Sequence, residues 1–530
     1  MRILALYQAP DQRTPVPLWS KSSNTRPNPY DDKTWDPYSR KSIFLTHSLF
    51  NAPTIQFSKA QQMAVLDWAF EMGAPDVPSM YELDKCSKKI KGLMGDSTRM
   101  FKTQTGHVFY VNQVGAFLRQ DFANLTIREQ MEFYPHDCDG FMSEVWHGEK
   151  MTLGHNREQL TPMVSLGGRS FFVNELTLLD DGSLFLTDMF LKHHGQLSAR
   201  GRKFELQDPA TCSGQNYFRF SDEIIDYPIS KFQQTCVDLT KIYPDGIIVS
   251  NGHQEWRDWF VPHPLRETAK GREVYSVPFI VFLDDVSGNA SKQWNKHWSC
   301  YASNSSLPRK KLNERLNIRF MTTSQYASPI EILEAIRADF DEAFDNPIVV
   351  WDAASGREVL VRPYIHLISG DNPMQAEECS TLGLRSNLFC RTCKAGGPHT
   401  YKISAEGFPL QMQSAQLRSP EHTIACIKQQ YEIAFTSKSA QHLAEHQRDS
   451  GVKDSIAQPL LEALIKRRKE LQKDSSLSFL EISKNLRTEY SQHIGSPDFQ
   501  MNPLLSLRGF NVHLDTPTET LHTILLGVVK

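Results

Sequence analysis

The chain has 530 residues, 58 Lys and Arg against 61 Asp and Glu, a net charge of −3 and a hydrophobic fraction of 40%. This is the composition of a globular protein, so intrinsic disorder along the whole chain is excluded. The near-neutral charge excludes a global basic field, and nucleic-acid binding would therefore depend on local basic patches.

Cysteine content and apolar runs indicate the compartment. Nine cysteines are too few for a disulfide scaffold and are typical of a reduced, intracellular protein. The N-terminus lacks the apolar segment of a secretory signal, and no apolar run approaches the roughly 18 residues of a membrane helix. We therefore expect no membrane partner.

The first part of the chain is predicted to change from extended to helical. Residues 1–58 are rich in Pro, Asn, Ser and Asp and have no sustained period, which predicts an extended N-terminal arm. Residues 59–147 form a predicted helical region, because apolar residues recur at spacings of three and four in 58–73 and 112–134.

Residues 148–274 are predicted to be β-rich, because short apolar runs alternate there with turn residues. Residues 169–191 predict two strands joined through Asp181-Gly182, a dipeptide typical of a β-hairpin turn.

A predicted catalytic core covers residues 275–378. The pattern predicts three strands, a helix and a fourth strand, over residues 275–285, 297–303, 316–324, 328–344 and 359–371. Acidic residues stand at the ends of the first and fourth strands. This is the order of a ribonuclease-H-like fold, so the predicted fold class is an α/β ribonuclease-H-like catalytic core within a multidomain α+β chain.

The remaining chain is predicted to complete this core after an insertion. Residues 379–505 hold a Cys-x-x-Cys element and a helical, charged insertion. Residues 506–530 are predicted to hold the last core strand and the start of a helix, because Asp515 precedes Pro517 as at a helix N-terminus. No stop signal precedes Lys530, so we expect this chain to be cut short.

The acidic residues predict a site for two metal ions. Phosphodiester cleavage by two divalent cations needs converging carboxylates, and Mg²⁺ or Mn²⁺ prefers such oxygen ligands. We expect these ions between Asp285, Asp371 and Glu519, with Asp284 and Asp515 as alternates. Asp284 and Asp285 should point to opposite faces of a regular strand, so one of them faces the site, and Asp285 is favoured. Taken singly, each acid also suits a turn or helix cap.

A second metal site is predicted at Cys390 and Cys393, which have the spacing of one zinc knuckle. Tetrahedral zinc needs four ligands, so Cys379 and His399 are the first choices for the others, with His513 and His522 further away in sequence. A pair of buried thiols in a tight turn is the alternative interpretation.

A basic and aromatic stretch follows the first acid. It interleaves tryptophans with the cations Lys292, Lys296, Arg309, Lys310 and Lys311. This mixture suits a nucleic-acid surface beside that acid. A hairpin edge protected by lysines explains it equally well.

Four segments together resemble a known family. They are VFLDDVSGNASKQWNKHWSCY, RFMTTSQYASPIEILEAI, SGDNPMQAEECSTLGLRSNLFCRTCKAGG and DTPTETLHTILLGVVK. They resemble the CACTA-like transposases of basidiomycete fungi, of the kind called Plavaka, which are related to plant En/Spm transposases. The resemblance covers most of the chain and is strongest over residues 245–530.

The resemblance implies a DDE/D transposase with a ribonuclease-H-like core. It assigns the first acid to Asp285 or Asp284, the second to Asp371, and the third to Glu519 with Asp515 as competitor. It also implies a zinc-binding Cys390 and Cys393, with His522 beside the third acid.

The resemblance further implies a setting for this activity. The partners would be double-stranded DNA, at transposon terminal repeats and at the target, and further copies of the chain in a synaptic complex. The expected location is the nucleus. Such proteins continue beyond the position of Lys530, and the alternative function is a catalytically inactive, transposase-derived DNA-binding or interaction protein.

Overall fold

The computed structural model describes residues 35–52, 55–153, 157–207, 216–220, 222–251, 253–257, 260–287, 296–436, 439–473, 476–495 and 498–518. The chain divides into two compact units, residues 1–96 and 97–530, each described here by itself. Among the described residues, no helix combines the length and apolarity that crossing a bilayer requires.

The first unit contains the helices α1 (Lys41–Phe50), α2 (Lys59–Glu71) and α3 (Met80–Met94). Helix α1 lies inside the region predicted to be an extended arm, and the structure differs from the prediction there. The reason is tertiary packing: Ile43 and Phe50 of α1 are buried together with Leu66, Leu83 and Cys86 of the other two helices. Residues 1–34 of the predicted arm lie outside the described residues.

The second unit begins with a hairpin inside the predicted helical region. Strands β1 (Thr98–Lys102) and β2 (Val108–Asn112) pair antiparallel. Helices α4 (Val114–Ala123) and α5 (Leu125–Arg128) follow, within the predicted helical stretch 112–134. The amide of Val114 at the start of α4 donates to Asp339 Oδ2 at 2.7 Å, which ties this helix to the core.

The β-rich region forms an extended sheet with the order β11-β6-β7-β8-β9-β12-β13 among the described residues, with β10 on β8 and β3 on β7. The predicted hairpin at Asp181-Gly182 is confirmed, because β6 and β7 pair antiparallel on either side of it. The bounds are β3 His136–Asp137, β6 Leu176–Leu179, β7 Leu184–His193, β8 Gln196–Leu206, β9 Tyr217–Phe220, β10 Ile225–Pro228, β11 Phe232–Gln234, β12 Ile248–Ser250 and β13 Glu255–Arg257.

Shorter elements complete this part of the chain. Strands β4 (Met163–Leu166) and β5 (Arg169–Phe172) form a separate antiparallel pair. The described helices here are η3 (Val145–His147), α6 (Glu149–Thr152), η4 (Arg157–Gln159), η5 (Ile229–Lys231), α7 (Cys236–Ile242) and α8 (Leu265–Ala269).

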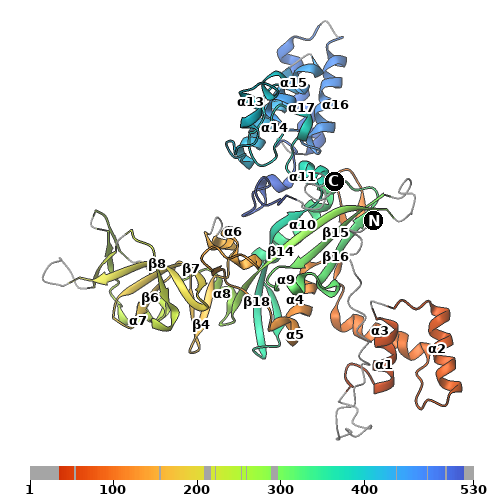
Figure 1. Cartoon of the computed structure of the whole chain (residues 1–530), viewed down its shortest axis with the longest axis vertical. Coiled ribbons are helices and arrows are strands. Elements are labelled where there is room, and N and C mark those ends of the chain that lie inside the picture. Colours follow the sequence, from red (N-terminus) through yellow and green to blue (C-terminus); the bar gives the residue numbers. More distant parts are fainter. Residues whose placement is uncertain are drawn as a thin grey trace. The chain divides into compact units, whose positions relative to one another are not determined.

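The predicted core contains a sheet with the strand order β16-β15-β14-β18-β17 in the described part of the chain. Strands β14, β15 and β16 pair antiparallel in sequence order, and β14 then pairs parallel with β18. Figure 1 shows β14, β15 and β16 side by side. The bounds are β14 Val274–Ser287, β15 Lys296–Asn304, β16 Ile318–Ser324, β17 Ile348–Asp352 and β18 Arg357–Ser369.

Strand β17 was not among the predicted elements. It pairs antiparallel with the first part of β18, from Ile348 opposite Val361 to Asp352 opposite Arg357. The observed order is therefore three strands, a helix and a hairpin whose second strand is the predicted fourth strand. This edge strand has five residues, and so short a segment does not show a recognisable alternation of apolar and polar residues.

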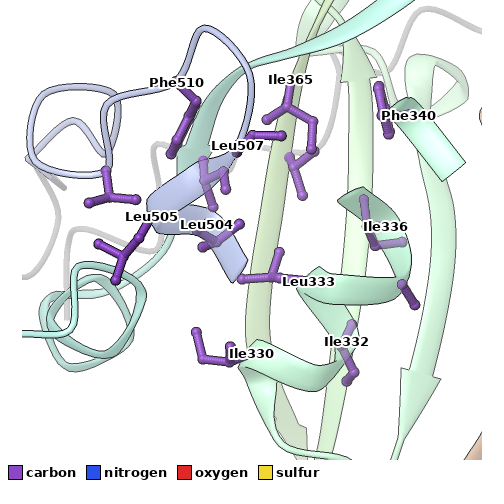
Figure 2. Close-up of a cluster of buried hydrophobic side chains, with 14 of the residues drawn as sticks. Ile330, Ile332, Leu333, Ile336, Phe340, Ile365, Leu504, Leu505, Leu507 and Phe510 are labelled. Carbon is purple, nitrogen blue, oxygen red and sulfur yellow. The ribbon is translucent and has the colours of Figure 1, made fainter. Parts of the chain in front are cut away.

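Helix α10 (Pro329–Asp345) packs its apolar face on this sheet. Ser328 caps it, accepting from the amide of Glu331 in a capping box that the Ser-Pro start favours. Figure 2 shows Ile332, Ile336 and Phe340 of α10 in one buried cluster with Ile365 of β18, and with Leu504, Leu507 and Phe510 from far along the chain. The core therefore includes the chain just before the third predicted acid.

The region after β18 is mostly helical in the part that the structure describes. Its elements are α11 (Asn372–Glu378), η7 (Gly383–Arg385), α12 (His399–Lys402), α13 (Gly407–Leu410), α14 (Pro420–Thr436), α15 (Ala440–Ser450), α16 (Ala457–Leu471), α17 (Phe479–Ile494) and η8 (Pro503–Ser506). Two short helices, α9 (Arg309–Leu312) and η6 (Arg315–Asn317), lie earlier in the chain, between β15 and β16.

The last predicted core strand is absent from the described residues of its region. Residues 507–518 form turns and irregular backbone instead. A single backbone hydrogen bond, from Ile368 N–H to the Asp515 carbonyl at 3.0 Å, joins this segment to β18. The predicted terminal helix falls on residues 519–530, outside the described residues.

Candidate active site

The first two predicted acids lie at the same end of neighbouring parallel strands. The last registered pair between β14 and β18 is Phe282 with Ser369. Continuing that register by two residues brings Asp284 level with Asp371. Neighbouring strands lie about 4.8 Å apart, so the carboxylates of Asp284 or Asp285 and of Asp371 share one edge of the sheet.

Asp284 and Asp285 stand on opposite faces of β14, as predicted, because both lie within the strand. Leu283 is fully buried on the face that packs on the core, and Asp285, two residues further, belongs to that face. Asp284 is half-buried, and its Oδ1 accepts from the amide of Asp285 at 2.7 Å. The backbone therefore already occupies one oxygen of Asp284.

Asp371 is the N-cap of α11. Its Oδ1 accepts from the amide of Met374 at 2.8 Å, which engages one of its two carboxylate oxygens. Gly370 allows α11 to approach closely, because a Cβ there would lie 2.9 Å from Met374 Cγ. The sequence Gly-Asp-Asn-Pro thus sets Asp371 directly where the strand turns into the helix.

Glu519 and His522 lie outside the described residues, but the chain that leads to them is held beside α11. Gln375 Nε2 donates to the Pro517 carbonyl at 2.5 Å. Arg391 Nη2 donates to Thr518 Oγ1 at 3.3 Å, while its Nη1 donates to Gln375 Oε1. Pro517, two residues before Glu519 in sequence, therefore contacts the helix that Asp371 caps.

Asp515 is engaged in the structure of this segment. It is buried, and its Oδ2 lies 2.9 Å from Lys150 Nζ and accepts from the amide of Asn511 at 2.7 Å. Burial lowers the pKa of Lys150, an effect that Asp515 opposes. Asp515 therefore serves as the partner of a half-buried lysine.

Glu378 is a carboxylate that sequence reasoning missed. It ends α11 and is fully buried, and neither of its oxygens has a hydrogen-bond partner among the described residues. Burial raises the pKa of Glu378 to about 8, Glu377 and Asp371 add to the rise, and Arg391 opposes it. Its spacing of seven residues from Asp371, two helical turns, was the available signal.

The cysteine knuckle is built around a buried arginine. Arg418 is 1% exposed, and its Nε donates to the Cys390 carbonyl at 2.8 Å. Burial acts against a thiolate at Cys390, but the amides of Cys393 and Thr392 and the Cys393 thiol outweigh it and lower the pKa of Cys390. The knuckle thus favours a thiolate at Cys390.

The other predicted zinc ligands are not assembled around this knuckle. Cys379 is buried, and its Sγ lies 2.8 Å from the Val512 carbonyl and 3.3 Å from Thr516 Oγ1. His399 begins α12, and neither residue joins Cys390 and Cys393 in a group of three ligand atoms within 4.8 Å among the described residues. His513 instead holds Thr423 Oγ1 at 2.9 Å.

The cations of the predicted basic surface do not lie together, because Lys296 and the cations of α9 are at opposite ends of β15. Lys292 lies outside the described residues, and Lys296 begins β15 opposite Ser287, at the acidic end. Strand β15 then runs away from that end, so that Asn304 pairs with Phe279. Six residues of β14 separate Phe279 from Asp285, about 20 Å at 3.4 Å per residue.

The cations of α9 are therefore not beside the first acid, and that prediction is corrected. Arg309 and Lys310 are exposed, whereas Lys311 Nζ is paired with Glu314 Oε1 at 2.8 Å. The reason for the separation is that β15 runs antiparallel to β14, so that α9, which follows β15, begins at the opposite end of the sheet from the acids.

One part of the chain matches a known family model. Residues 163–275 match a family model described as a domain of unknown function, DUF8591. This segment runs from β4 to the start of β14 and precedes both acids of β14. No curated protein matches the chain.

Proposed function

We propose that this chain is a DDE/D-type DNA transposase that cleaves transposon ends and transfers the cut strand to target DNA. The observation that carries the proposal is the placement of Asp285 and Asp371 at one edge of a parallel strand pair, with the segment leading to Glu519 fastened beside them. The strand order around β14 supports a ribonuclease-H-like core, with β17 as an addition at its edge.

The carboxylates suit hard divalent cations. Asp285, Asp371 and Glu519 would hold Mg²⁺ or Mn²⁺, and such an ion, when bound, would supply activation of the attacking hydroxyl and neutralisation of charge on the phosphate. Asp371 would offer the oxygen that the helix cap does not use. We assign the third role to Glu519 because Asp515 is committed to Lys150. Hydrolytic nicking would precede strand transfer.

The proposal includes a structural zinc ion at Cys390 and Cys393. The start of α14 supplies two further side chains suited to it, because Cys426 Sγ lies 3.8 Å from His422 Nδ1. The thiols of Cys390, Cys426, Cys393 and Cys379 all act on the charge of Arg418, so each of them lies in its surroundings.

Double-stranded DNA is the proposed partner, in the nucleus and in a complex with further copies of the chain. Lys296 begins β15 at the acidic end of the sheet, and Arg309 and Lys310 follow the other end of that strand, about 20 Å further along the sheet. Such a spacing suits contacts to phosphates along one duplex, whose charges repeat every 1.7 Å of its axis.

A plasmid-nicking assay tests the function. We expect the full chain to convert supercoiled plasmid to open circles in Mn²⁺, and Asp371→Asn to lower the rate about 100-fold. Asp67→Asn, on an exposed position of α2, is the matched control and should not change the rate. Metal-independent nicking, or full activity of Asp371→Asn, would contradict the proposal. A chain that binds DNA without nicking would support the inactive, transposase-derived alternative.

A further inference from the structure

Three metal-binding side chains converge outside the proposed active site. His136 in β3, Cys138 just after it and His147 in η3 place their ligand atoms within 4.8 Å of one another. All three side chains are half-buried, so they are accessible to an ion from solution. Neither the acids nor the cysteine knuckle shares a residue with this group.

Backbone structure holds the two histidines at this distance. His136 pairs with Lys192 of β7, which fixes it on the edge of the extended sheet. Asp139 and Gly140 have positive φ angles of 52° and 85°, and they turn the chain back. Trp146 is buried in an apolar cluster and anchors η3, which carries His147.

A fixed carboxylate orients His136. Glu132 Oε2 lies 3.0 Å from His136 Nε2 and 2.6 Å from Lys192 Nζ. Its Oε1 accepts from the amides of Phe133 and Tyr134 at 3.0 and 3.2 Å. Metal-binding histidines commonly turn their second nitrogen to such a carboxylate. Glu132 is placed to serve as such a carboxylate for His136.

We propose that His136, Cys138 and His147 bind one transition-metal ion of the zinc class. A thiolate and two imidazoles are soft or borderline ligands, which favour Zn²⁺, Co²⁺ or Cu²⁺ over the hard Mg²⁺. Three protein ligands leave the fourth tetrahedral position to water. On binding, the Cys138 thiol releases its proton to solvent and the sulfur–metal bond forms, with no change in oxidation state.

The ion would close the loop between β3 and η3. That loop carries Glu144, whose Oε2 accepts from the Arg309 amide at 2.5 Å. Bound metal would therefore hold Glu144 against α9, at the far end of the sheet from the acids. Binding of the ion would fix this loop and is independent of the proposed transposase activity.

Cobalt titration of the full chain tests the proposal. We expect Co²⁺ added to metal-stripped protein to give thiolate-to-cobalt absorption. The double variant Cys390→Ser/Cys393→Ser should keep the part of this absorption that comes from Cys138. Cys138→Ser should lose that remaining absorption when introduced into this double variant. His147→Gln in the same background should weaken cobalt binding about 10-fold or more. His194→Gln is the matched control, because His194 is an exposed neighbour of this site outside the group.

Thermal unfolding gives a second readout. Zn²⁺ should raise the melting temperature of the double variant and of its His194→Gln derivative, but not of its Cys138→Ser derivative. Absence of cobalt absorption in the folded double variant would overturn the proposal. So would unchanged absorption and stoichiometry after Cys138→Ser.

Discussion

The backbone amide of Ile368 donates to the Asp515 carbonyl at 3.0 Å, three residues before Asp371. This bond lies on the part of β18 beyond its pairing with β17. The terminal segment therefore runs beside the strand that delivers the second acid. Lys150 completes the arrangement, because its Nζ lies 2.9 Å from Asp515 Oδ2 and donates to the His366 carbonyl.

Removing the Asp515 carboxylate should destabilise the protein. Asp515→Ala leaves the half-buried Lys150 without its carboxylate partner, and we expect a loss of about 3 kcal/mol in the free energy of unfolding. Urea denaturation measures it. The double variant Lys150→Met/Asp515→Leu should recover most of this loss, because it removes both charges. An Asp515→Ala protein of unchanged stability but no nicking activity would instead make Asp515 the third acid.

Glu378 should make stability depend on pH. Its folded-state pKa of about 8 lies above the usual 4.5, so the folded chain binds a proton that the unfolded chain releases. Its contribution is therefore complete below about pH 4.5 and is lost as the pH rises to about 8, by roughly 1.4 kcal/mol per pH unit. Glu378→Gln should flatten the unfolding free energy over this range, whereas Glu377→Gln should not. Equal pH slopes for wild type and Glu378→Gln would contradict this assignment.

Arg391 should matter for catalysis more than for folding. Its guanidinium joins Gln375 of α11 to Thr518, so Arg391→Met should release the segment that leads to Glu519. We expect nicking to fall about 10-fold or more, with faster amide hydrogen exchange over residues 511–518. Exchange measured by mass spectrometry separates this effect from general unfolding. Lost activity with unchanged exchange in that segment would argue against positioning.

The exposed cations of α9 should contribute to DNA affinity. The double variant Arg309→Ala/Lys310→Ala should weaken binding of a 30-base-pair duplex and reduce the salt dependence, log K against log salt, by about 2. Fluorescence anisotropy at several salt concentrations measures both quantities. Arg467→Ala is the matched control, because Arg467 is an exposed arginine already paired with Glu489 at 2.9 Å. An unchanged slope in the double variant would remove α9 from the DNA surface.

The sequence predicted the parts of this chain whose periods are long and regular. Strands β14, β15, β16 and β18 and helix α10 follow their predicted ranges, because a buried strand and a capped amphipathic helix are local patterns. Helix α1 was missed because its stability depends on burial of Ile43 and Phe50 against other helices. The local pattern of apolar residues in the sequence does not indicate such tertiary contacts.

The residues of the candidate sites also fall into those that the sequence could predict and those that it could not. Asp285 and Asp371 could be predicted because each ends an apolar strand of the core. Burial of Glu378 and the meeting of His136 with His147 could not, because both depend on residues that pack from distant elements. The ion pair between Asp515 and Lys150 could not be predicted either, because the two residues are 365 positions apart in sequence.

Iron-mediated cleavage of the polypeptide tests the convergence of the three acids most directly. With added hydrogen peroxide and ascorbate, Fe²⁺ bound in place of Mg²⁺ reduces the peroxide to hydroxide and a hydroxyl radical, which cuts the backbone near the ion, and ascorbate returns the Fe³⁺ to Fe²⁺. The account predicts cuts near Asp285, Asp371 and Glu519 together, all suppressed by excess Mg²⁺ and all lost in Asp371→Asn. Cuts confined to one of these positions, or cuts that Mg²⁺ does not suppress, would contradict it.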